Sequence, residues 1–222
     1  MTLLIFDCDG VLVDSEVLAH AAMADLLSEL GRPIPMSEAL KIFSGKRLRD
    51  ALAAAESWLG APIPPDVAAR AGERLLATFR RELKPVGGVR QAIEALPYPR
   101  CVASSSTPER LRVSLEVTGL APLFGDNVFS ADRVEHGKPA PDLFLFAAHA
   151  MSAEPGACIV IEDSEPGVAA ARAADMTAIG FIGASHSNGD IAERLASAGA
   201  DVVIDAMAEL PAAVEQLLTA RR

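Results

Sequence analysis

Two aspartates directly follow an apolar run near the start of this sequence. Asp7 and Asp9 come after the run 3–6 (LLIF), with one residue between them. Residues i and i+2 of an extended chain point to the same side, so both carboxylates are expected to face one site. Gly10 then lets the backbone turn away without a side chain.

A second acidic pair stands at the end of another apolar run. Glu162 and Asp163 follow the run 158–161 (CIVI). Ligands of open parallel α/β sheets bind beyond the carboxyl ends of the strands, so the two pairs are expected to meet in one crevice. An Asp after a strand is often only a helix N-cap, and "EDS" at 162–164 also fits that role. The joint placement of the two pairs at strand ends favours a metal site.

Four converging carboxylates need a cation. Two like charges 4 Å apart cost about 4 kcal/mol at an effective dielectric constant of about 20. Hard oxygen ligands, with no His or Cys group at metal-ligand spacing, suit Mg²⁺, which binds one or two carboxylates together with phosphate oxygens and water. The sequence therefore predicts a Mg²⁺ cofactor.

The elements that must position these residues alternate along most of the chain. Strands are expected at 2–7, 100–104, 157–162, 177–182 and 201–204, and helices at 87–96, 107–118, 141–151, 164–174, 188–198 and 207–220. This alternation predicts an α/β fold, a parallel sheet with helices on both faces.

Residues 15–83 break that rhythm, because their pattern is helical throughout. We therefore expect a core domain made of 1–14 and 84–222, with an all-helical insert at 15–83. "ELKPVGG" at 82–88 is the expected return linker.

Composition limits the classes of partner. The 222 residues have a formal net charge of −10, and no Lys/Arg run exceeds two residues, so no nucleic-acid partner is expected. No apolar segment approaches the roughly 18 residues of a membrane span, so no membrane partner is expected either. The three cysteines, Cys8, Cys101 and Cys158, lie in or at the end of apolar runs. We expect buried thiols and a cytoplasmic protein.

The motifs resemble those of the haloacid dehalogenase-like hydrolases. "FDCDGVLVDSE" is similar to their first motif, DxDGxxxDS, and the likeness continues through Ser104 in "CVASSS", Lys138 in "HGKPAPDLF" and "IEDSEPGV" at 161–168. All four motifs occur in order. The closest resemblance is to the subfamily with a helical cap after the first motif, which includes β-phosphoglucomutase and sugar-phosphate phosphatases such as 6-phosphogluconate phosphatase. It implies a Rossmann-like core and a cap.

The resemblance assigns the acidic residues. Asp7 is expected to attack phosphorus and to bind the metal. Asp9 is expected to protonate the leaving oxygen, to deprotonate the attacking water, and to bind the metal through its backbone carbonyl. Asp163 is the expected carboxylate ligand, with Glu162 a ligand or a group that supports one.

The resemblance also assigns the neighbouring polar residues. The Ser104 hydroxyl and the Ser105 amide are expected to hold the phosphoryl oxygens, although "SSSTP" at 104–108 could also simply cap the following helix. Lys138 is expected to balance the negative charge of phosphate and Asp7. In the cap, "FSGKRLRDAL" at 43–52 matches the family's Gly-containing loop, so Lys46, Arg47 and Arg49 are candidate substrate contacts.

The expected function is hydrolysis of a small phosphorylated metabolite, such as a sugar phosphate, by a monomer. A β-phosphoglucomutase-like mutase remains the alternative. The sequence departs from the mutase pattern at Ala19, where the mutase has His, and near Leu48, where it has a phosphate-binding Arg. A receiver-type phosphoacceptor domain is a third, weaker reading, because its acceptor Asp follows the third strand.

Overall fold

A parallel sheet forms the centre of the molecule. The computed structural model describes residues 2–43, 46, 48–185 and 190–220. In this part of the chain the strands run in the order β3-β2-β1-β4-β5-β6, all parallel. Their bounds are β1 Leu3–Phe6, β2 Arg100–Ser104, β3 Val128–Ser130, β4 Cys158–Glu162, β5 Thr177–Phe181 and β6 Val202–Ile204.

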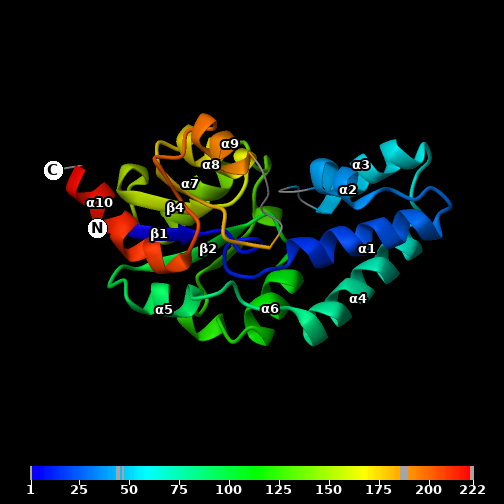
Figure 1. Cartoon of the computed structure of the whole chain (residues 1–222), viewed down its shortest axis with the longest axis horizontal. Helices are drawn as coiled ribbons and strands as arrows, with labels where there is room; N and C mark the ends of the chain where they lie inside the picture. The colour runs from blue at the N-terminus through cyan, green and yellow to red at the C-terminus, as the bar shows by residue number, and fades with distance from the viewer. Residues whose placement is uncertain (1, 44–45, 47, 186–189, 221–222) are drawn as a thin grey trace.

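Helices cover both faces of this sheet (Figure 1). One face packs against α5 Val89–Glu94, α6 Pro108–Val117 and α10 Leu210–Ala220, and the other against α7 Asp142–Ala150, α8 Glu165–Ala173 and α9 Ile191–Ser197. Short 3-10 turns lie at Ala121–Leu123, Ala131–Arg133, Pro155–Ala157 and Met207–Glu209.

The central strand β1 is buried on both faces. Leu4 and Phe6 belong to the cluster that contains α5, α6 and α10, whereas Leu3 and Ile5 belong to the cluster on the opposite face. All four are at most 1% exposed. Each such side chain contributes about 1.5–3 kcal/mol by leaving water, so the residue after β1 starts from a firmly fixed backbone.

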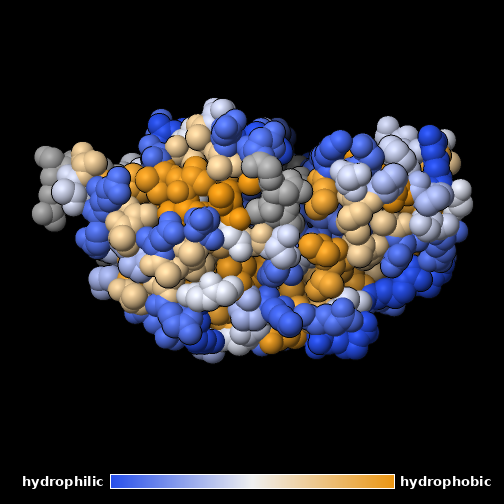
Figure 2. All heavy atoms as spheres, viewed as in Figure 1, coloured by the Kyte–Doolittle hydropathy of each residue, from blue (hydrophilic) through white to orange (hydrophobic). Residues whose placement is uncertain are grey.

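Four further helices lie at one end of the molecule, away from the sheet (Figure 1). They are α1 Glu16–Glu29, α2 Met36–Phe43, α3 Leu48–Leu59 and α4 Pro65–Glu82. They enclose a small apolar cluster of their own around Leu27, Phe43 and Ala55. Only Phe79 of α4 is buried, and the surface over this helix is mostly hydrophilic (Figure 2).

The two chain segments that join these helices to the sheet are hydrogen-bonded to each other. Val13 pairs with Pro85 in an antiparallel bridge. Asp14 N donates to Lys84 O at 3.0 Å, and Val86 N donates to Leu12 O at 3.0 Å. The helical segment is therefore attached through one short paired linker.

The α/β fold expected from the sequence is confirmed, with element ends shifted by a few residues at most. Strand β3, Val128–Ser130, was not expected. It has only three residues and pairs on one side, with β2, so its sequence carries too few alternating positions to reveal a strand. No helix in the described ranges has the length and apolar character needed to cross a membrane. The three cysteines are buried free thiols.

Candidate active site

The strand order brings the expected site residues to one edge of the sheet. Because β1 lies between β2 and β4, Asp7 is flanked by Ser104, which ends β2, and by Glu162, which ends β4. The Asp7 N–H donates to Ile161 O at 3.0 Å, which extends the pairing of β1 with β4 by one residue. The chain passes from β1 to β2 on one side and from β4 to β5 on the other. Open parallel sheets bind ligands at the point between two such strands, beyond their carboxyl ends.

Three of the four carboxylates converge at this edge. Asp7, Glu162 and Asp163 each place an oxygen within 4.8 Å of the others. Their exposed fractions are only 7%, 0% and 7%. Helix capping does not account for the pair after β4, because the Ser164 hydroxyl caps α8 by accepting from Gly167 N at 3.2 Å.

Lys138 reaches this cluster from the loop before α7. Its Nζ donates to Asp7 Oδ1 at 2.9 Å and to Glu162 Oε1 at 2.5 Å, and its side chain is 2% exposed. Nζ also lies 5.0 Å from the ring centroid of Phe144, near the start of α7. Burial lowers the pKa of Lys138, but the carboxylates of Asp7 and Glu162 outweigh it and raise the pKa overall. The lysine therefore stays charged beside Asp7.

Glu162 has both carboxylate oxygens occupied. One accepts from Lys138, and the other accepts from Asp163 N at 3.1 Å, Ser164 N at 3.1 Å and Ser164 Oγ at 2.9 Å. Gly167 makes room for this group, since a Cβ there would lie 1.9 Å from Glu162 Cδ. Of the two roles expected for Glu162, the geometry favours the supporting one, which is to hold Lys138 and the loop that carries Asp163.

The cluster suits a divalent cation. Burial raises the pKa of Asp7 well above its ordinary value, Lys138 opposes this, and the carboxylates of Glu162 and Asp163 raise it further. Burial also raises the pKa of Asp163, with Glu162 adding to the effect. Three carboxylates share one lysine here, so another positive charge would be favourable. Their hard oxygen donors fit Mg²⁺.

Asp9 is not one of these three clustered carboxylates, although its charge raises the pKa of both Asp7 and Asp163. Its Oδ1 accepts from Arg110 Nη2 at 2.7 Å and from Ser15 Oγ, and its Oδ2 accepts from Ser106 Oγ at 2.5 Å. Burial raises the pKa of Asp9, but Arg110 and the two hydroxyls outweigh this and lower it overall.

The reason that Asp9 has its own partners lies in the backbone after β1. The strand ends at Phe6, and residues 8–13 form a tight turn in which Leu12 N donates to Cys8 O at 2.9 Å. Gly10 has a φ of 78°, a conformation that favours glycine. The rule for residues i and i+2 therefore does not extend to Asp9, because the chain is no longer extended there. The backbone carbonyl of Asp9 remains an expected ligand.

The serines after β2 are not needed to cap α6. Thr107 does this by accepting from Arg110 N at 3.3 Å, with Pro108 in the first turn. Ser104 Oγ accepts from Ser106 N at 3.2 Å. The Ser105 hydroxyl is buried and has no hydrogen-bond partner within the described ranges, which leaves it available to a ligand.

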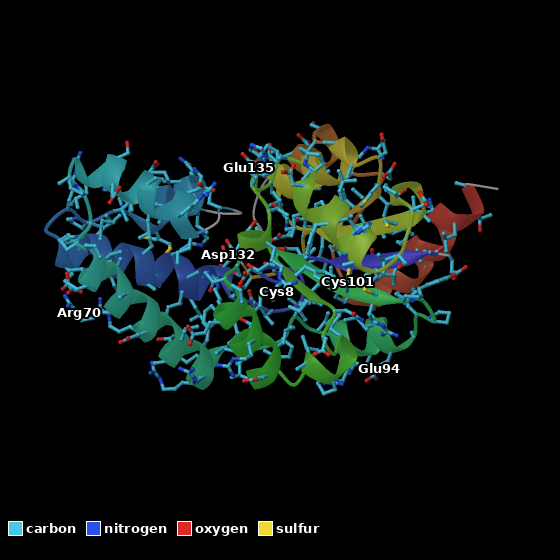
Figure 3. The ribbon with its side chains drawn as sticks, turned by 180° about the vertical axis from the view of Figure 1, so that it is seen from behind. Cys8, Arg70, Glu94, Cys101, Asp132 and Glu135 are labelled. Carbon is cyan, nitrogen blue, oxygen red and sulfur yellow. The ribbon has the colours of Figure 1, made fainter. Side chains whose placement is uncertain are left out.

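Two of the three candidate cap residues lie at the surface. Lys46 and Arg49 are exposed, and Arg47 lies outside the described residues. Arg49 lines a cavity of about 200 Å³ together with Ala131, Asp132 and Val134 of the core. Asp132 lies on the side of the core that faces the cap, as does Cys8, which stands between Asp7 and Asp9 (Figure 3).

Ser106 and Arg110 were missed by the sequence reasoning. Arg110 lies in the first turn of α6, where the helix dipole disfavours a positive charge. A cation at that position indicates a specific partner nearby, and this is the signal that could have identified it.

The fold and this site define an α/β enzyme with a buried carboxylate–lysine centre at the ends of its central strands. The family model of the haloacid dehalogenase-like hydrolases matches residues 1–175, and the chain belongs to this family.

Several relatives of this chain are named as phosphatases. The chain is 29% identical over 183 residues to 6-phosphogluconate phosphatase of Escherichia coli, covering 82% of this chain and 83% of the relative. It is 30% identical to hexitol phosphatase B of Escherichia coli, covering 94% and 93%. The solved structure of a haloacid dehalogenase-like protein of unknown function from Agrobacterium tumefaciens is similar, with a TM-score of 0.84 and 39% identity over 98% of this chain and 99% of that one. The chain is therefore a phosphoric monoester hydrolase of this family.

Proposed function

We propose that this chain is a Mg²⁺-dependent phosphatase that hydrolyses a small sugar phosphate through an aspartyl-phosphate on Asp7. The observation that carries the proposal is the Asp7 carboxylate, held at 2.9 Å by the Lys138 ammonium beside Asp163. A carboxylate that pairs with a lysine and lies next to a cation site can approach a phosphoryl group without prohibitive repulsion. The phosphatase relatives support the substrate class.

In the first step an Asp7 oxygen attacks phosphorus, and the bond from phosphorus to the sugar oxygen breaks. The leaving oxygen takes a proton from Asp9, which acquires it from solvent when the negatively charged phosphate binds nearby and raises the pKa of its carboxyl. In the second step water attacks the phosphorus of the aspartyl-phosphate and gives a proton to Asp9, which releases inorganic phosphate and restores Asp7. Lys138 and the Ser104–Ser105 turn hold the phosphoryl oxygens. Asp7 and Asp163, with the Asp9 carbonyl, would hold Mg²⁺, whose charge offsets that of the phosphate.

We further propose that 15–83 acts as a cap that moves at the paired linker and selects the substrate. Asp14, the last core residue before this segment, is itself held in the core, because its Oδ1 accepts from Ser185 Oγ at 2.7 Å. Of the candidate cap residues that the structure describes, Arg49 is the one that lines a cavity shared with the core, and we expect it to contact the far end of a substrate. Replacing Arg49 with Ala should change the ranking of sugar phosphates by KM and leave p-nitrophenyl phosphate unaffected.

The test of the function is a panel of phosphorylated metabolites assayed for phosphate release with and without Mg²⁺, using the wild type and Asp7→Asn. We expect Mg²⁺-dependent release by the wild type and none by the variant, with unchanged circular dichroism. Phosphatase activity retained by a folded Asp7→Asn protein would rule out the assigned nucleophile.

Hydrolysis is favoured over the mutase alternative. Ala19 occupies the position where the mutase has a histidine, and the neighbouring His20 is 3% exposed with its Nε2 3.5 Å from Glu16 Oε2. A buried imidazole paired within its own helix is poorly placed to meet a substrate. Incubation with β-glucose 1-phosphate separates the two activities, since a phosphatase releases phosphate and a mutase forms glucose 6-phosphate.

A further inference from the structure

Arg110 lies where the core and both ends of the helical segment meet. It belongs to the first turn of α6 in the core, and its guanidinium carbon lies 5.2 Å from the ring centroid of Phe79 in α4. It also interacts electrostatically with Glu16, the first residue of α1. Its side chain is 22% exposed.

The guanidinium has one strong hydrogen bond, from Nη2 to Asp9 Oδ1 at 2.7 Å. Within the described ranges its Nε has no hydrogen-bond partner. The remaining contacts of Asp9 come from Ser15 at the start of the helical segment and from Ser106 in the core. Ser106 is itself fixed, because its carbonyl accepts from Ser130 Oγ at 2.7 Å. The Asp9 carboxylate is thus oriented by three donors, Ser15 at the start of the helical segment and Ser106 and Arg110 from the stretch that follows β2.

A stability role alone accounts poorly for this arrangement. A largely buried ion pair often adds no net stability over apolar residues of the same volume. Arg110 also occupies a helix turn whose dipole disfavours its charge. The buried ion pair and the unfavourable helix dipole both accompany the fixing of one carboxylate, that of Asp9. Asp9 lies two residues after the proposed nucleophile, Asp7.

We propose that Arg110 is a positioning residue for catalysis, which orients the Asp9 carboxylate for proton transfer to the leaving oxygen. This inference rests on the proposed function, since it assigns how Asp9 is held for that reaction. Phe79 supports the guanidinium from the cap side, so the orientation of Asp9 depends on where α4 stands relative to α6.

The test uses two aryl phosphates that differ in how much their leaving oxygen needs a proton. p-Nitrophenyl phosphate has a good leaving group, and phenyl phosphate a poor one. The parameter kcat/KM reports the step in which this oxygen departs. For Arg110→Met we expect kcat/KM to fall by about 100-fold with phenyl phosphate, the lower end of what a general acid contributes, and only a few-fold with p-nitrophenyl phosphate. Asp9→Asn should show the same selectivity, and the double variant should be no worse than Asp9→Asn alone.

Arg112→Met is the matched control. Arg112 lies on the same helix, is exposed and pairs with Glu116 at 2.8 Å, so its loss should leave both substrates unchanged. Arg110→Lys provides a second variant if the Met protein does not fold, and it should show the same selectivity with a smaller loss, because the ammonium lacks the planar fork.

The outcomes are distinct. If the wild type does not hydrolyse p-nitrophenyl phosphate in the presence of Mg²⁺, the proposed function fails and this inference with it. If the wild type is active but folded Arg110 variants lose both substrates equally, or neither, only the positioning role is overturned.

Discussion

Replacing Gly167 with Ala should damage the active site without touching any residue that binds substrate. The backbone of Gly167 is helical, so alanine suits its conformation and would add about 1 kcal/mol of helix stability in isolation. The new Cβ would lie 1.9 Å from Cδ and 2.0 Å from Oε1 of Glu162. Ordinary contact begins near 3.4 Å, so Glu162 must retreat by about 1.5 Å.

Glu162 cannot move away from the new Cβ without weakening its hydrogen bonds. It is fully buried, and Lys138 and the Asp163 and Ser164 amides all bind it. Overpacking costs about 1–3 kcal/mol, and weakened hydrogen bonds to a buried charge add to that. After the helix gain is subtracted, a net loss of about 2 kcal/mol is expected, which lowers the Tm by about 4–8 °C. Displacement of Lys138 and Asp163 by an ångström should lower kcat by about 100-fold.

Thermal melting and phosphate release measure both effects. Gly72→Ala in α4 is the control, because nothing lies within 4 Å of its Cβ position. The control should melt slightly higher than the wild type and turn over normally. If Gly167→Ala behaved like Gly72→Ala, Glu162 would not have the positioning role argued here.

Three further predictions concern the metal, the lysine and the helix cap. Burial raises the pKa of Asp7 and Asp163, so protons compete with Mg²⁺, and Mg²⁺ affinity measured by calorimetry should rise with pH across the range above about 4, where ordinary carboxyls are already ionised. A carboxyl whose pKa rises on folding stabilises the folded state most when it is protonated, so the metal-free protein should lose Tm over the same window, and added Mg²⁺ should restore it. Lys138→Met leaves two buried carboxylates unbalanced, and urea denaturation without metal should show a loss of about 3–5 kcal/mol together with loss of turnover. Thr107→Ala removes the α6 cap and should cost about 1 kcal/mol in the same denaturation assay while turnover stays near wild type, whereas a large loss of activity would mean that the cap shapes the site.

Much of the fold could be predicted because its signals are local. The spacing of apolar residues along the sequence indicates where strands and helices alternate. The residues that follow two apolar runs are enough to identify Asp7 and Asp163 as candidates. The three-residue strand β3 has too short a pattern to be recognised in this way. Strand order, which places β2 and β4 on either side of β1, follows from packing over the whole chain and not from any one segment.

The finer features of the site depend on geometry that no local pattern encodes. The Asp9 carboxylate is held by Arg110 and two serines, not by the acidic cluster, because the chain turns directly after β1. The partnership of Asp9 with Arg110 joins residues 101 positions apart. The need for glycine at Gly167 appears only when Glu162 is seen to occupy the space of its missing side chain.

The central claim is that Asp7 takes the phosphoryl group, and trapping that intermediate tests it most directly. Wild-type protein with Mg²⁺ and p-nitrophenyl phosphate would be quenched in acid within a single turnover, digested and analysed by mass spectrometry. The account predicts a phosphoryl adduct on Asp7 that vanishes in Asp7→Asn. An adduct on a different residue, or turnover in a folded Asp7→Asn protein, would contradict it.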